Sequence, residues 1–285
     1  MNALYKTCLS KNKTTIFFLL FLFLLNACTH TTKSDSKDDY LDNDPHLKGS
    51  SERPISSSSF AETTKSPTDS LFWKDRWVYI PFEEGFELLS TEVTQEMYSS
   101  IMDTLPFQKD IHDSLPVISV SWYDAALFCN ALSKILGLDS VYEYSSIGPK
   151  NTLLQLKINQ NNGVYLPSLN QWLYALNGKS DTDLDSTTED NLRVYAHFGG
   201  SNSGPIQVAQ KQANHWNLYD MFGNVEEWVA YCDGKPVPTN ASTCMVKGGS
   251  WASPSHQLKS DFEKRQVPDT RSDTIGFRVA KNVTK

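Results

Sequence analysis

The chain has 285 residues, a formal net charge of -7 and 39% hydrophobic residues. Nothing along it is basic enough for a nucleic-acid-binding footprint, so no nucleic-acid partner is expected. The length is sufficient for one domain, or two small ones, with a sizeable core.

Residues 1–27 are typical of an export leader. Lys6, Lys11 and Lys13 precede an apolar run at residues 16–25. This run is shorter than the roughly 20 apolar residues that a transmembrane helix needs, and it fits the core of about 7–15 residues found in secretory signals. The sequence therefore predicts export.

A cysteine follows this leader directly. The segment Leu25-Asn26-Ala27-Cys28 resembles the lipobox of bacterial lipoproteins, in which the cysteine thiol is acylated before cleavage. Several acyl chains would anchor the protein stably in a lipid bilayer. Thr29 lacks the acidic retention signal of inner-membrane lipoproteins, so an outer-membrane location is expected, on its periplasmic or its cell-surface face. An ordinary signal peptide with a coincidental cysteine is the alternative.

Residues 28–70 are predicted to form a flexible tether. They are rich in Ser, Thr, Asp and Lys and have almost no periodic apolar residues. Such a segment cannot bury enough apolar surface to offset the entropy lost on ordering. It would hold the remaining domain, residues 71–285, away from the membrane.

Three helices are predicted early in this domain, at residues 94–102, 121–136 and 168–177. Each begins with a capping signature and continues with apolar residues at helical spacing. The capping residues are Thr94 for the first helix, Ser121 with Asp124 for the second, and Ser168 with Gln171 for the third.

The second half of the domain is predicted to be irregular. Residues 181–204 are mostly Asp, Ser, Gly and Asn, which predicts a surface loop. Short apolar segments at 225–231, 245–246 and 275–280 predict short strands. The seven tryptophans of the chain suggest a core built from large aromatic side chains.

The domain contains three cysteines. Because an oxidising envelope permits disulfides, Cys232 and Cys244 are the plausible pair. They would close a loop of about a dozen residues, worth perhaps 3 kcal/mol of stability. Cys129 lies on the apolar face of the second predicted helix and is expected to be a buried free thiol.

Six motifs occur in a fixed order along the domain. They are residues 92–94 (EVT), 116–125 (PVISVSWYDA), 165–168 (YLPS), 217–228 (NLYDMFGNVEEW), 248–251 (GGSW) and 268–278 (PDTRSDTIGFR). Their order and spacing resemble the formylglycine-generating enzyme, or sulfatase-modifying factor, family over residues 92–280. The resemblance implies an α+β fold that is irregular, loop-rich and C-type-lectin-like.

The resemblance also bears on catalysis. The oxidase branch of the family holds copper with two cysteines that follow the Gly-Gly-Ser-aromatic motif, because soft thiolates select Cu(I). Aligned on that motif, the two positions are Ser253 and Leu258 in this chain. A hydroxyl and an aliphatic side chain cannot hold Cu(I). Copper is therefore not expected, and formylglycine generation is predicted to be lost.

Calcium, in contrast, is implied by the resemblance. The family's oxygen ligands match the side chains of Asp220 and Glu227 and the backbone carbonyls of Gly223 and Val225. These are the hard donors that calcium requires. A capped turn whose carboxylates bond only to backbone amides is the alternative. The family's second calcium site has an asparagine where this chain has His197, so that site is expected to be absent.

Histidines offer little support for another metal. The iron-dependent branch of the family takes its ligands from a separate helical domain, which this chain lacks, and the six histidines here are far apart. His256 is the most interesting, because it lies in the degenerate copper loop.

Four cations lie close to acidic residues near the end of the chain. We expect them to form ion pairs that organise loops. They are Lys264, Arg265, Arg271 and Arg278, with Asp261, Glu263, Asp269 and Asp273 nearby in sequence.

The function that this pattern favours is that of a pseudoenzyme: a non-catalytic, lipid-anchored envelope protein whose domain is a binding or scaffolding module. Long loops on one face suit recognition. An envelope protein, or a glycan by analogy with lectins, would be the ligand. The alternative is an oxidoreductase of the sulfatase-modifying factor type with an altered active site that uses His256 or another group in the old active-site loop.

Overall fold

Capped helices and short strands make up the computed structural model, which describes residues 74–106, 112–159, 162–177, 188–200, 204–239 and 241–283. All of them belong to one compact unit, residues 61–285. The leader, Cys28 and the whole of the predicted tether lie outside the described residues. Among the helices of the described ranges, none has the length and apolarity that crossing a membrane requires.

The three predicted helices are confirmed as α1 (Gln95–Met102), α2 (Trp122–Ile135) and α3 (Leu169–Asn177). Their predicted caps are present. The Thr94 side chain accepts the Met97 N–H at 3.2 Å. Ser121 and Asp124 bond to each other's backbone N–H groups at 3.1 and 2.7 Å, and Ser168 and Gln171 do the same at 3.2 and 2.9 Å. Local side-chain chemistry thus fixes where each helix begins.

A fourth helix corrects the prediction of a surface loop at residues 181–204. Helix α4 spans Glu189–Tyr195, and Thr188 caps it by accepting the Asn191 N–H. Glu189 also pairs with Arg193 one turn later, at 2.7 Å. The sequence signals for this helix are the threonine cap and the acidic first turn. The prediction missed these signals because it was based on the composition of the whole segment, residues 181–204, which is mostly Asp, Ser, Gly and Asn.

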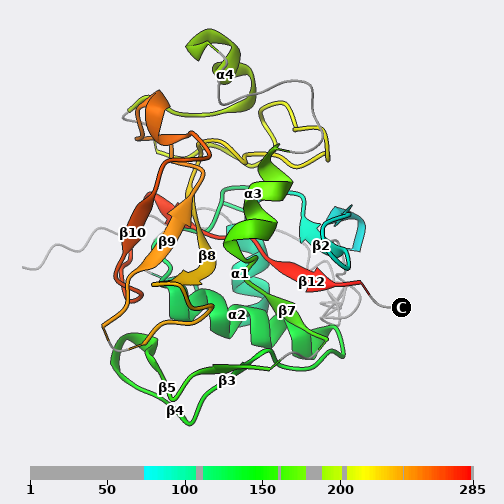
Figure 1. Cartoon of the computed structure of the whole chain (residues 1–285), viewed down its shortest axis with the longest axis vertical. Helices are drawn as coiled ribbons and strands as arrows, with labels where there is room; N and C mark the ends of the chain where they lie inside the picture. The colour runs from blue at the N-terminus through cyan, green and yellow to red at the C-terminus, as the bar shows by residue number, and fades with distance from the viewer. Residues whose placement is uncertain are drawn as a thin grey trace, which may run out of the picture. The chain divides into compact units, whose positions relative to one another are not determined.

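The first and last strands of the domain lie in one sheet, with strand order β1-β2-β12-β7. Strand β12 pairs antiparallel with both β2 and β7 (Figure 1). This pairing brings the two ends of the domain together. The strands are β1 (Trp77–Ile80), β2 (Phe86–Leu89), β7 (Val164–Tyr165) and β12 (Ala280–Asn282), with the short 3-10 helix η1 (Lys74–Arg76) before β1.

A second sheet has the order β10-β9-β8-β11. Its long central strand β8 confirms the predicted strand at 225–231, and β9 confirms the one at 245–246. The predicted strand at 275–280 divides between this sheet and the first. The strands are β8 (Glu226–Cys232), β9 (Cys244–Lys247), β10 (Lys264–Gln266) and β11 (Ile275–Gly276).

Two small two-stranded sheets lie beyond α2 in Figure 1. They pair β3 (Tyr142–Glu143) with β6 (Lys157–Ile158), and β4 (Ser146–Ile147) with β5 (Leu153–Leu154). The 3-10 helix η2 (Pro149–Asn151) forms the turn between β4 and β5.

Large aromatic side chains fill the core, as predicted. Trp122, Trp172 and Trp228 are fully buried. Each indole N–H has an acceptor: the Val229 carbonyl, the Glu227 carboxylate and the Val120 carbonyl, respectively. Buried tryptophans therefore fill space and also connect α2, α3 and β8.

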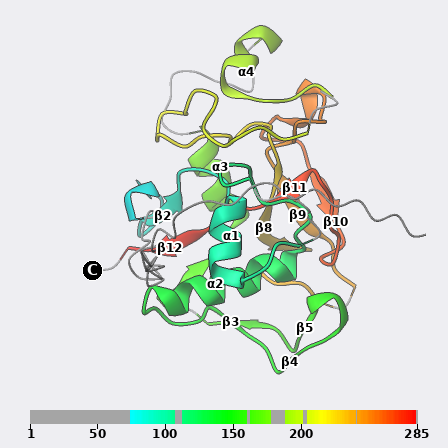
Figure 2. The same cartoon turned by 180° about the vertical axis from the view of Figure 1, so that it is seen from behind.

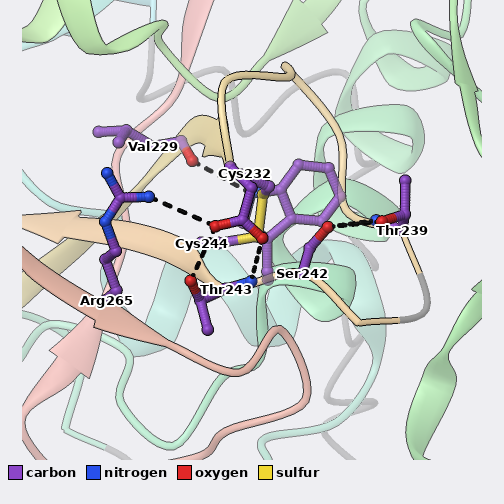
Figure 3. Close-up of a disulfide and its surroundings, with 9 residues drawn as sticks. Val229, Cys232, Thr239, Ser242, Thr243, Cys244 and Arg265 are labelled. Carbon is purple, nitrogen blue, oxygen red and sulfur yellow. Dashed lines mark hydrogen bonds and ion pairs between the residues drawn. A yellow bond between two sulfur atoms is a disulfide. The ribbon is translucent and has the colours of Figure 1, made fainter. Parts of the chain in front are cut away.

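A disulfide joins Cys232 and Cys244, which face each other on β8 and β9 (Figure 3). Beside it, Asp233 accepts the backbone N–H of Thr243 at 2.8 Å and its hydroxyl at 3.0 Å. The loop between the two strands is thus closed covalently and by hydrogen bonds. Cys129 is a buried free thiol, and burial raises its pKa well above the usual value.

Candidate functional site

The two positions aligned with copper-binding thiols lie in a closely packed loop. Ser253 is 5% exposed, and its hydroxyl accepts the Ser250 N–H at 3.1 Å. Leu258 is 2% exposed and packs on Gly249, where an added β-carbon would lie 2.7 Å from the leucine Cδ1. A turn hydrogen bond and a core contact therefore occupy the two positions.

Backbone bonds hold this loop against the segment that contains His197. The N–H groups of Gly199 and Gly200 donate to the carbonyls of Ser253 and Trp251, at 2.9 and 3.0 Å. His256 lies in the 3-10 helix η4 (Ser255–Gln257), is exposed, and has its ring edge-on to Phe262 at 6.1 Å.

The described histidines lie apart from one another. His197 contacts the Gly204 carbonyl through Nε2 at 3.1 Å, His112 contacts Gln207, and His215 packs on Trp216. Within the described ranges, no group of three or more His, Cys, Asp or Glu side chains is arranged to hold a metal ion. The calcium site expected from the sequence has two acidic side chains and two backbone carbonyls as ligands, so it would not be a group of this kind.

A buried charge cluster lies where that calcium site was expected. The Arg278 guanidinium and the Glu227 carboxylate form a two-point ion pair, with N–O distances of 2.6 and 2.7 Å. Trp172 donates a further bond to Glu227 at 2.7 Å. Arg278 also donates to the Tyr219 and Leu89 carbonyls, at 2.9 and 3.3 Å. One arginine thus joins β8 to the end of β2 and to the loop that contains Tyr219.

Glu92 is a third acidic member of this cluster, which the sequence interpretation noted only as part of a motif. It is fully buried between β2 and α1 and accepts the Val225 N–H at 3.1 Å and the Asn224 amide at 2.8 Å. Burial raises its pKa well above the usual value, and the negative charges of Asp220 and Glu227 raise it further. Glu92 therefore fastens the turn that contains Gly223 and Val225.

Asp220 is the least satisfied carboxylate of the cluster. Its Oδ2 accepts the Ala209 N–H at 2.7 Å, whereas its buried Oδ1 has no hydrogen-bond partner in the described part of the chain. Burial raises its pKa as well. Glu92, Asp220 and Glu227 all interact with the positive charge of Arg278, and full ionisation of three carboxylates beside one guanidinium would bury excess negative charge. Protons or a bound cation could balance that charge.

Two of the expected calcium ligands, Asp220 and Glu227, lie in this cluster and keep acceptor capacity. Among the described residues, Asp220 Oδ1 has no hydrogen-bond partner and Glu227 Oε1 accepts one N–H, from Arg278, although a carboxylate oxygen can accept two bonds. The turn between them is tight: Gly223 has a φ of +76°, and a β-carbon there would lie 2.3 Å from the His197 carbonyl oxygen. The two side chains and the Gly223 and Val225 carbonyls would be the groups that hold the ion.

The cations near the chain end do form ion pairs, but mostly with distant acids. Arg265 is the exception, because it reaches the nearby Glu263 as well as Asp233, at 3.4 Å each. The other pairs are Lys264 with Glu226 at 2.7 Å, Arg271 with Asp124 at 2.8 Å, and Arg278 with Glu227. Sequence proximity therefore predicted the right kind of contact but, apart from Glu263, the wrong partners.

Comparison with protein families gives one match that covers most of the chain. The family described as the sulfatase-modifying factor enzyme 1-like domain matches residues 77–283 of this chain.

Curated relatives are identical to this chain at about a quarter of the aligned residues. Chaperone protein LppX of Paenibacillus barcinonensis is 27% identical over 221 residues, which are 67% of this chain and 78% of that protein. The inactive C-alpha-formylglycine-generating enzyme 2 and the formylglycine-generating enzyme of Mus musculus are each 26% identical over 58% of this chain. The matches span 49% and 44% of those two proteins, about half of their length.

Solved structures support the same fold. Treponema denticola variable protein 1 superposes with a TM-score of 0.63 at 26% identity and covers 73% of this chain and 91% of its own. CarF gives a TM-score of 0.56 at 25% identity, over 70% of this chain and 87% of its own. The irregular α+β, C-type-lectin-like architecture is therefore confirmed by the structure and by its structural neighbours.

Proposed function

The chain belongs to the sulfatase-modifying factor family, and on this premise we propose that it is a non-catalytic, lipid-anchored protein of the cell envelope whose domain binds or scaffolds a partner. Cys28 would carry the lipid, and residues 28–70 would space the domain from the outer membrane. The partner would be an envelope protein or a glycan.

One observation carries the loss of catalysis. The positions that hold copper in the oxidase branch are Ser253 and Leu258, and each side chain is engaged in packing of its own. Neither group provides the soft sulfur that Cu(I) requires. The names of two relatives fit a non-catalytic role, since one is called an inactive formylglycine-generating enzyme and the other a chaperone.

Calcium has a structural role in this proposal. Bound by Asp220, Glu227 and the carbonyls of Gly223 and Val225, it would offset the negative charge that Arg278 leaves unbalanced. The loop would then be rigid, and a rigid loop binds a partner with a smaller loss of conformational entropy.

Copper titration of the purified protein tests the proposal. Under reducing conditions, we expect no stoichiometric Cu(I) binding and no copper-dependent oxygen consumption, whereas a formylglycine-generating enzyme assayed in parallel should show both. Stoichiometric copper or iron together with oxygen consumption would instead support the altered oxidoreductase, with His256 as the first residue to substitute.

A further inference from the structure

A polar cavity of about 250 Å³ lies between the start of α1 and the loop at residues 207–210. In Figure 2, α1 is on the near side of the molecule and the yellow loop lies above it. None of the lining residues belongs to the degenerate copper loop. Those with side chains relevant to binding are Arg76, Thr91, Thr94, Glu96, Asp113 and Tyr219.

Hydrogen bonds between distant segments hold the walls of this cavity in place. The Val208 N–H donates to the Ser114 carbonyl at 2.9 Å, and the Tyr219 N–H donates to the Ser90 carbonyl at 2.8 Å. The buried charge cluster supports the same walls, because Asp220 accepts the Ala209 N–H and Arg278 donates to the Tyr219 carbonyl. The cavity is therefore formed before any ligand arrives.

The cavity carries charges of both signs that do not pair with each other. Arg76 is half-buried, and Glu96 and Asp113 are exposed. In the described part of the chain, none of these three side chains has an ion-pair or hydrogen-bond partner. A guanidinium and two carboxylates thus remain available to a ligand in one cavity.

Charge and size together define the ligand class. Glu96 and Asp113 disfavour a simple anion, and a simple cation would leave the guanidinium of Arg76 without a partner in the ligand. The volume is below the roughly 300–1,000 Å³ typical of sites for drug-sized ligands. A small zwitterion satisfies both constraints.

We propose that this cavity binds a free α-amino acid. Its carboxylate would bond to the planar fork of Arg76, a geometry that guanidinium groups favour. Its ammonium group would lie toward Glu96 and Asp113. Thr94, whose hydroxyl oxygen already accepts the Met97 N–H, can still donate its own hydrogen to the ligand carboxylate. None of the residues that line this cavity lies in the copper loop, so the proposal does not depend on whether the protein is an enzyme.

Calorimetry with the standard L-amino acids, each titrated singly into the purified protein, tests this proposal. At least one should bind saturably with one-to-one stoichiometry. For that amino acid, the N-acetyl derivative and the carboxamide derivative should each bind at least about tenfold more weakly, since each lacks one of the two charges.

Variants locate the site. Arg76→Gln should weaken binding at least about tenfold, and the exposed pair Glu96→Gln with Asp113→Asn should also weaken it without affecting the fold. The matched control Arg193→Gln removes an exposed arginine that does not line the cavity and should bind as the unmodified chain does. The proposal is overturned if no amino acid binds, if either derivative binds as well as the parent, or if the cavity variants bind normally.

Discussion

At the centre of the domain, three carboxylates that are distant in sequence face one arginine. Arg278 bonds Glu227 at two points, Glu92 fastens the neighbouring turn, and one Asp220 oxygen has no hydrogen-bond partner among the residues that the structure describes. In an apolar interior, each uncompensated charge opposes folding. The ionisation of this cluster should therefore control stability.

A pH dependence follows from the direction of the pKa shifts. Burial raises the pKa values of Glu92 and Asp220 above those of the unfolded chain. The folded state therefore binds protons more tightly, and the free energy of unfolding falls as the pH rises through the raised folded values. In chelator, urea unfolding should show greater stability at about pH 5 than at about pH 8. Glu92→Gln, which cannot ionise, should flatten this profile, and an unchanged slope would contradict the assignment.

Substitution of Glu227 tests the calcium proposal. Glu227→Ala breaks the two-point ion pair with the buried Arg278, so it should lose about 3–5 kcal/mol of stability even in chelator. The unmodified protein should melt at a higher temperature in calcium than in chelator, and the variant should not. Glu226→Gln is the matched control, since this neighbouring residue pairs with Lys264 and is no proposed ligand. The calcium site would be contradicted if calcium raised the melting temperature of Glu227→Ala as much as that of the unmodified protein. It would also be contradicted if calcium did not raise the melting temperature of the unmodified protein.

At the scale of elements, the sequence predicted the features that depend on residues close together in the chain, such as the starts of helices. The two residues of each capping pair, which begin at Ser121 and at Ser168, are three positions apart. The starts of α2 and α3 could therefore be located from local chemistry. The pairing of Glu227 with Arg278 joins residues 51 positions apart, and the division of the 275–280 segment between two sheets depends on packing. Charge and periodicity carry no information on such distant pairings.

The turn that holds the expected calcium carbonyls offers a steric test. Gly223→Ala would place a β-carbon 2.3 Å from the His197 carbonyl oxygen. Gly200→Ala is the control, because Gly200 has a similar φ of +73° and open space around it. The control should lose about 1–2 kcal/mol from its backbone conformation alone. Gly223→Ala should lose about 1–3 kcal/mol more, and equal losses in thermal unfolding would mean that the turn relaxes freely.

At the scale of the whole molecule, the proposed anchor determines where the domain can act. Cys28→Ser should abolish incorporation of a radiolabelled fatty acid and release the protein from the membrane fraction, because acylation requires the cysteine thiol. Cys129→Ser provides a control that removes a cysteine from the domain and leaves the label in place. Labelling that persists in Cys28→Ser would refute the anchor.

The central claim is that a domain of the sulfatase-modifying factor fold persists here without the family's oxidation chemistry. The copper positions are taken by a hydrogen-bonded serine and a buried leucine, Ser253 and Leu258. The most direct measurement is mass spectrometry of a sulfatase-type cysteine peptide after incubation with the purified protein, copper and oxygen. We predict that the peptide keeps its thiol, and conversion of its cysteine to the aldehyde would contradict the account.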